Sequence, residues 1–193
     1  VDKFTINKQV DFNVPLWAAV DFHSVGSDDT IVTLMDKDNN VWQYNIKGSL
    51  DSQYQQIATI LDKCKKLVTA FLESNSIGSV MTNEISKLTK QKSKIIEWTT
   101  TNETKENQVG LIQTLLTKDM MHFEYRNTQL KSQFDTFTYS FSKTKKVTYA
   151  ALAGYHDDRI LSLMMCVQAK EDYAYSTGNN VVFVKSRSAS SMR

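Results

Sequence analysis

The chain has 193 residues, of which 41% are hydrophobic and 23% are charged, and this suits one globular domain with a hydrophobic core. Its formal net charge of +2 is too small either to demand or to exclude a nucleic-acid partner. No apolar run approaches the length of a membrane span and the N-terminus lacks a signal-peptide pattern, so no membrane partner is expected.

The first part of the chain predicts an antiparallel meander of three strands. Residues 1–13 are polar and irregular, and we expect them to form a lead-in without regular structure. Polar turns at 23–28 and 38–40 separate the apolar segments that follow. Short turns between neighbouring strands are typical of a meander. We therefore predict strands at residues 14–22, 30–36 and 41–47.

After residue 48, helical spacing of apolar side chains alternates with short apolar runs. The run at 65–72 is nearly continuous, which favours a parallel strand that is buried on both faces. Alternation at 137–149, around the polar residues 142–145, predicts a β-hairpin. The other predicted elements are helices at 49–64, 76–90, 105–118, 127–137 and 157–172, a strand at 94–98 and a short edge strand that ends at Phe123.

The last part of the chain has a different composition. Residues 174–193 are rich in serine and asparagine and have no apolar period beyond Val184, so we expect a flexible C-terminal tail. Residues 1–173 are then a single domain. Cys64 and Cys166 lack metal-ligand spacing and lie in or beside predicted helices, so we expect buried free thiols in a reducing compartment.

The order of the elements, three strands and then helices alternating with strands, indicates an α/β mixed sheet with helices on both faces. This order resembles that of the ribonuclease H-like fold: three antiparallel strands, then parallel strands, here with an added β-hairpin. In that fold the first strand, the fourth strand and the last helix each carry an acid.

Acidic residues stand where three apolar segments stop or start. Asp21 ends the first strand, Glu73 follows the strand at 65–72, and Asp157 and Asp158 open the last helix. Carboxylates that converge at one edge of a sheet repel one another unless a cation joins them. The pattern therefore predicts a site for hard divalent metal ions, and with it phosphodiester chemistry.

A two-metal site gives each acid a role. Two Mg²⁺ or Mn²⁺ ions about 3.5–4 Å apart stabilise the attacking and the leaving oxygen. Asp21 and Asp158 would hold one ion, and Glu73 would share the other ion with Asp21. Asp29, or its neighbour Asp28, would add an outer ligand from across the hairpin.

His156 and Asp157 lie beside these acids, and either would orient a water or stabilise the leaving group. Simpler interpretations stay open for both. One member of the pair Asp157 and Asp158 also suits a helix cap, because acids at that end favour the helix dipole. His156 also suits an ordinary loop histidine.

Two segments carry a likeness to a known family. Glu73, Asn75 and Gly78 resemble the Glu-x-Asn-x-x-Gly stretch of phage terminase large subunits, and residues 155–163 resemble the His-Asp-Asp-Arg motif that opens their last nuclease helix. The likeness spans roughly residues 14–172. Further matching segments are Asp21 with Gly26 and residues 28–30, Thr104 with Lys105, residues 134–138 and residues 149–151.

The resemblance implies the C-terminal nuclease domain of a viral genome-packaging motor. Such a domain cuts concatemeric double-stranded DNA with Mg²⁺ or Mn²⁺ in the cytoplasm of the host cell. By motif, Asp21, Glu73 and Asp158 take the metal positions, and Asp29 matches a less constant accessory acid. The motif leaves open which of Asp157 and Asp158 is essential, and we favour Asp158.

The same resemblance implies partners outside this chain. The sequence has no Gly-x-x-x-x-Gly-Lys-Ser/Thr loop, so we expect no ATP hydrolysis by this fragment. The start at Val1 indicates an excised domain, and an N-terminal ATPase domain would precede it. The portal and the small terminase subunit are the other partners that the family implies.

DNA binding is expected to rest on contacts with the phosphate backbone, because a packaging nuclease cuts many sequences. Lys143, Lys145 and Lys146 on the hairpin are the preferred contacts, together with His156. A second group of lysines, near residues 87–94, is a weaker candidate for DNA contact. For the hairpin lysines the alternative is a solvent-exposed turn without a binding role.

Two alternative functions remain open. An integrase-like strand transferase usually takes its third acid as a glutamate inside the last helix, but Glu171 comes too late in the chain. A non-catalytic module that docks onto DNA or the portal would retain the acids for stability alone.

Overall fold

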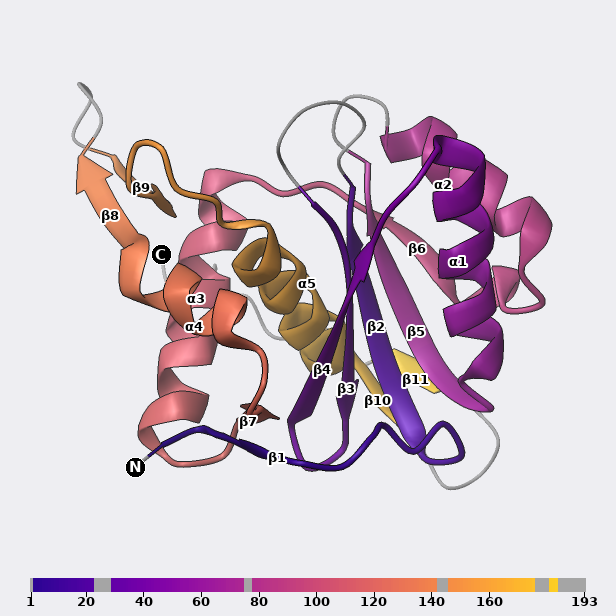
Figure 1. The fold of residues 1–193 in the computed structure, drawn as a ribbon, viewed down its shortest axis with the longest axis horizontal. Helices are drawn as coiled ribbons and strands as arrows, with labels where there is room; N and C mark the ends of the chain where they lie inside the picture. The colour runs from indigo at the N-terminus through magenta and orange to yellow at the C-terminus, as the bar shows by residue number, and fades with distance from the viewer. Residues whose placement is uncertain (1, 23–28, 75–77, 142–145, 176–180, 184–193) are drawn as a thin grey trace, which may run out of the picture.

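The computed structural model describes residues 2–22, 29–74, 78–141, 146–175 and 181–183. A seven-stranded mixed sheet forms its centre, in the order β1-β7-β4-β3-β2-β5-β6 (Figure 1). The strands of this sheet are β1 (Phe4–Ile6), β2 (Pro15–Asp21), β3 (Thr30–Asp36), β4 (Asn40–Ile46), β5 (Lys66–Glu73), β6 (Ile95–Trp98) and β7 (His122–Glu124).

The predicted ribonuclease H-like sheet is confirmed in its strand directions. β2, β3 and β4 pair antiparallel as the expected meander. β5 then joins β2 in parallel, and β6 joins β5 in parallel. The prediction also has the positions of these strands right to within two residues.

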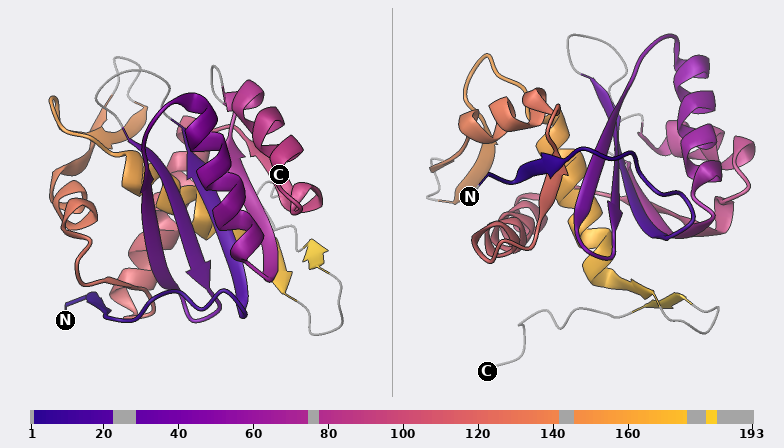
Figure 2. Two further views of the ribbon diagram at one scale, coloured as in Figure 1. Left: turned by 45° about the vertical axis from the view of Figure 1, so that its right-hand side comes forward. Right: turned by 60° about the horizontal axis from the view of Figure 1, so that its bottom comes forward.

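Helices cover both faces of the sheet, as predicted (Figure 2). α1 and α2 pack on one face, and α3, α4 and α5 pack on the other. The helices are α1 (Leu50–Lys63), α2 (Gly78–Leu88), α3 (Asn102–Thr117), α4 (Thr128–Thr136) and α5 (Asp158–Asp172), with a short 3₁₀ helix at Lys92–Lys94.

The central strand β2 is buried on both sides, which explains its unbroken apolar run. Leu16, Ala18 and Val20 face the core under α1 and α2. Trp17 and Ala19 face the core under α3, α4 and α5. Residues alternate between the two faces of a strand, so a strand between two helical layers needs no polar face.

Two more strand pairs lie outside the main sheet. β8 (Phe137–Phe141) and β9 (Val147–Ala151) form the predicted antiparallel hairpin. β10 (Tyr173–Tyr175) and β11 (Val181–Phe183) form another antiparallel pair. The second pair lies in the segment for which we predicted a flexible tail, and the described part of that segment therefore includes regular structure.

Two further features differ from the sequence-based prediction. β1 lies in the predicted irregular lead-in and pairs with β7, with the Phe4 and Phe123 rings 5.1 Å apart. α3 begins three residues before the predicted start at Lys105, because Thr101 and Thr104 form a capping box. The predicted start of α2 lies partly outside the described residues.

Both cysteines are free and fully buried, as expected from the sequence. Burial raises the pKa of Cys64 to about 12, and burial also raises the pKa of Cys166. Both thiols therefore stay protonated and inert. Among the described residues, no helix is both long and apolar enough to span a bilayer.

Candidate active site

The ends of two parallel strands bring the first two acids together. Val20 of β2 lies beside Leu72 of β5 in the parallel register, and each strand ends one residue later, at Asp21 and at Glu73. Asp21 forms a side-chain hydrogen bond with Glu73. The predicted convergence of these two acids is therefore present at the edge of the sheet where β2 and β5 end. This edge lies at the top of Figure 1.

The third acid comes from helix α5, which packs across β2 and β3. Asp158 is 6% exposed, and its Oδ2 accepts the backbone N–H of Asp29 at 3.3 Å. Asp158 and Asp157 both lie close enough to Asp21 to act on its ionisation. The structure thus brings all four predicted catalytic acids to the same end of the molecule.

Asp21 is the most perturbed acid of this cluster. Its side chain is 2% exposed, and among the described residues its Oδ2 has no hydrogen-bond partner. Burial raises the pKa of Asp21 well above its usual value, and the hydrogen bond to Glu73 and the charges of Glu73, Asp158 and Asp157 raise it further. The protonated form of the Asp21 carboxyl is therefore favoured when no cation is bound.

This arrangement fits a hard divalent cation. A buried carboxylate oxygen without a partner is costly, and a cation beside Asp21 would remove that cost and favour the ionised form of the carboxyl. Within the described residues, no three acidic, histidine or cysteine side chains have the spacing of a preformed metal site.

Asp29, the predicted accessory ligand, already has partners. The side-chain amide of Asn45 donates to Asp29 Oδ2. Arg159 carries a positive charge within electrostatic range of Asp29 and of Asp158. Asp29 therefore supports Asp158 through its own backbone N–H, and its neighbour Asp28 lies outside the described residues.

A buried polar chain holds α5 against the sheet one turn after Asp158. The hydroxyl oxygens of Ser162 and Thr33 lie 2.7 Å apart, and Ser162 Oγ is 3.2 Å from the carbonyl oxygen of Ile31. Gln43 donates to Thr33 Oγ1 and to the carbonyl oxygen of Arg159. These bonds fix the start of α5, and they therefore fix the position of Asp158 relative to the ends of the strands.

Asp157 stands at the N-cap position of α5, but its side chain makes no capping hydrogen bond. Its Oδ2 instead accepts the backbone N–H of Ala151, in β9, at 3.3 Å. The prediction that one acid of the pair acts as a cap is therefore wrong for Asp157. The capping oxygen comes from Gln133 of α4, which sequence reasoning did not single out.

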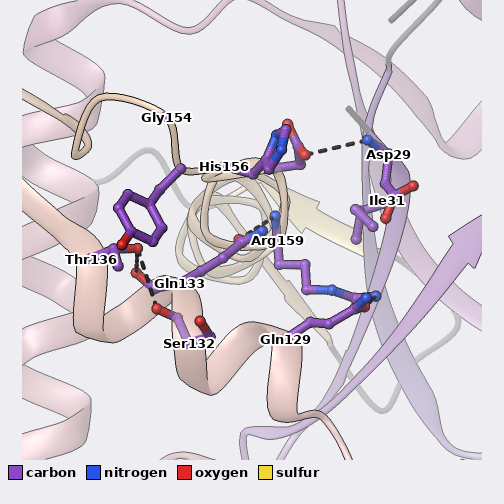
Figure 3. Close-up of a pocket in the computed structure, with 11 residues that line it drawn as sticks. Asp29, Ile31, Gln129, Ser132, Gln133, Thr136, Gly154, His156 and Arg159 are labelled. Carbon is purple, nitrogen blue, oxygen red and sulfur yellow. Dashed lines mark hydrogen bonds between the residues drawn. The ribbon is translucent and has the colours of Figure 1, made fainter. Parts of the chain in front are cut away.

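A pocket of about 220 Å³ opens beside Asp158 (Figure 3). Arg159, His156 and Asp29 line one side of it. The polar face of α4 lines the other side, with residues at positions i, i+3, i+4 and i+7: Gln129, Ser132, Gln133 and Thr136. His156 is exposed at the rim, so the structure leaves it accessible to a substrate.

Of the three predicted DNA-binding lysines on the hairpin, the structure describes one. Lys146 is exposed just before β9, whereas Lys143 and Lys145 lie outside the described residues. In the second group, Lys87 forms an ion pair of 2.6 Å with Glu84.

The fold is ribonuclease H-like, and it is the fold of the nuclease domains of phage large terminases. The nuclease of the large terminase of thermophilic phage G20c, with bound magnesium, superposes with a TM-score of 0.64 at 15% identity over 79% of this chain and 80% of that one. The nuclease domain of bacterial virus Sf6 matches with a TM-score of 0.64 at 12% identity, over 80% and 88%. The predicted likeness to this family is confirmed at the level of the fold.

The large terminase of bacteriophage HK97 matches with a TM-score of 0.62 at 10% identity, over 85% of this chain but 40% of that one. No protein-family model matches the sequence of this chain, and no curated protein is significantly similar to it. The likeness to terminase nucleases that these comparisons show is therefore a likeness of fold.

Proposed function

We propose that this chain is a divalent-metal-dependent endodeoxyribonuclease that cuts concatemeric double-stranded viral DNA during genome packaging. The observation that carries the proposal is the buried carboxylate of Asp21, which is hydrogen-bonded to Glu73 and has one oxygen without a partner. The fold shared with phage terminase nucleases supports the same assignment.

Asp21, Glu73 and Asp158 would hold the metal ions. The donor set consists of carboxylate oxygens, which suits Mg²⁺ or Mn²⁺, and two such ions would activate a water and stabilise the leaving oxygen of the phosphodiester. Structures of the G20c nuclease contain magnesium, cobalt or zinc. Asp21 would serve both ions, because Glu73 and Asp158 both lie within electrostatic range of it.

The protein residues around the acids position them and exclude water from part of the site. Asp29 and the chain through Ser162 fix Asp158, while the buried ends of β2 and β5 fix Asp21 and Glu73. Asp157 and His156 stand on the open side of the cluster. They would contact the scissile strand and its leaving group.

The chain would act as one part of a packaging motor. An N-terminal ATPase domain in the same polypeptide, the portal and the small terminase subunit are the proposed partners, and the host-cell cytoplasm is the proposed location. The match to 40% of the HK97 large terminase supports a place within a longer polypeptide.

The alternatives fit this geometry less well. Glu171 lies 13 residues after Asp158 on α5, about 20 Å along the helix axis, which is too far for the third acid of a strand transferase. A docking module that kept its acids for stability would not bury an unpaired carboxylate oxygen, because such a group is destabilising.

A plasmid-cleavage assay tests the proposal. We expect nicked and linear products in Mn²⁺ or Mg²⁺, none in EDTA, and none from Asp21→Asn. The matched control is Asp51→Asn, which changes an exposed aspartate on α1 and should leave cleavage intact. Cleavage that survives Asp21→Asn, or an unmodified protein that cuts at no metal concentration, would refute the proposal.

A further inference from the structure

The N-terminus of α5 is capped from another helix. The first backbone N–H groups of a helix have no partner within the helix itself. Gln133 Oε1, from α4, accepts the N–H of Arg159 at 2.9 Å (Figure 3). The same oxygen accepts the N–H of Ile160 at 3.3 Å. Arg159 and Ile160 are both buried, so water is a poor substitute for this oxygen.

This cap leaves the neighbouring acids available. An aspartate at the N-cap position usually satisfies these N–H groups itself. Here Asp157 turns instead to the N–H of Ala151, and Asp158 accepts the N–H of Asp29. Both acids remain within electrostatic range of Asp21. The capping amide is neutral, so it adds no further negative charge beside the acid cluster.

Neighbouring side chains join the helix of the capping glutamine to the start of α5. The glutamine lies on the α4 face that lines the pocket, one turn after Gln129, whose side chain binds the guanidinium of Arg159. Asn127 caps α4 through the N–H of Leu130 and also donates to Gln43, which in turn binds the carbonyl of Arg159. Helix α4 and the first turn of α5 are therefore joined by side chains on both sides of Arg159.

We propose that Gln133 is a positioning residue for the metal site: its side chain sets the first turn of α5, and thereby the place of Asp158 relative to Asp21 and Glu73. This inference rests on the proposed nuclease function. Groups that orient metal ligands from behind typically change metal affinity or activity by about 10–100-fold when removed. A cap that served stability alone would leave metal affinity unchanged.

The test uses three variants of the whole chain. Gln133→Met removes the acceptor oxygen at similar length, and Gln133→Glu keeps an acceptor at the same place. Gln113→Met makes the first change at an exposed glutamine of α3. Each protein is measured for hydrogen exchange at the N–H groups of Arg159 and Ile160, for Mn²⁺ affinity by calorimetry, and for kcat and KM on plasmid DNA.

We expect Gln133→Met to speed exchange at both N–H groups, to weaken Mn²⁺ binding about tenfold, and to lower kcat with little change in KM. Gln133→Glu should restore amide protection, because it keeps the acceptor oxygen, and Gln113→Met should behave like the unmodified protein. Faster exchange in Gln133→Met with unchanged Mn²⁺ affinity and kcat would overturn the inference and leave Gln133 a structural cap.

Failure of the proposed function would show in the unmodified chain, whereas failure of the inference would show only in the Gln133→Met variant. If the unmodified chain binds no Mn²⁺ and cuts no DNA, the nuclease assignment fails and the inference falls with it. If the unmodified chain binds and cuts while Gln133→Met does so equally well, only the inference is refuted.

Discussion

Replacing Asp21 by asparagine should stabilise the metal-free protein while abolishing cleavage. The pKa of Asp21 is raised above its usual value by burial, by the hydrogen bond to Glu73 and by nearby charges. An acid whose pKa is higher in the folded than in the unfolded state loses stability as pH rises through those two values. At neutral pH the unmodified protein therefore carries a cost that asparagine removes.

The size of the effect follows from the unpartnered oxygen. A buried polar group without a partner costs about 1–3 kcal/mol, and the amide of an asparagine can donate to Glu73. We expect Asp21→Asn to raise the free energy of unfolding by about 2 kcal/mol in EDTA, or Tm by about 4–8 °C for a domain of this size. In Mn²⁺ the unmodified protein should become the more stable of the two, because it binds the ion and Asp21→Asn does not. An ion at 100 times its Kd adds about 2.7 kcal/mol to the free energy of unfolding of the protein that binds it.

The assay is thermal unfolding of both proteins in EDTA and in Mn²⁺, at pH 7 and at pH 5. The advantage of Asp21→Asn in EDTA should shrink at the lower pH, because protonation relieves the unmodified protein. Asp51→Asn should show no such pattern. The account fails if Asp21→Asn is less stable than the unmodified protein in EDTA. It also fails if Mn²⁺ raises the Tm of Asp21→Asn as much as that of the unmodified protein, because Asp21 would then not bind the ion.

Two other substitutions test the supports of the site. Ser162→Ala should lower the free energy of unfolding in urea by about 1–2 kcal/mol, because it breaks the buried hydrogen bond with Thr33; an unchanged urea midpoint would mean that this bond does not hold α5. Lys146→Ala should weaken DNA binding and lower the slope of log affinity against log salt by about 1, as expected for one lost phosphate contact. Lys37→Ala, at an exposed lysine that is paired with Asp38 and belongs to neither candidate group, is the matched control, and equal salt slopes for the two variants would reject the role of the hairpin.

The sequence predicted the elements that have strong periodic patterns. The meander, the central strand β5, the hairpin and α5 each have an apolar pattern long enough to define them. β1 has three residues and gains its strand structure from pairing with β7 and from the contact between Phe4 and Phe123. Such tertiary stabilisation leaves no periodic signal in the sequence.

The acid cluster was accessible from sequence because strand ends determine it. Asp21 and Glu73 end neighbouring parallel strands, so their meeting follows from topology. The roles of Arg159 and Gln133 do not follow in this way, because each depends on how α4 packs against α5. Asp157 shows the limit most clearly: its position predicted a cap, and a glutamine 24 residues earlier in the chain took that role.

The central claim is that Asp21, Glu73 and Asp158 gather around shared cations. Crystals of the protein grown with Mn²⁺ and measured at a wavelength with strong manganese anomalous scattering test it directly. The account predicts anomalous peaks in contact with Asp21, with Glu73 and Asp158 as further ligands and the hydrogen bond between Asp21 and Glu73 broken. Crystals that contain Mn²⁺ elsewhere while Asp21 remains hydrogen-bonded to Glu73 would contradict it.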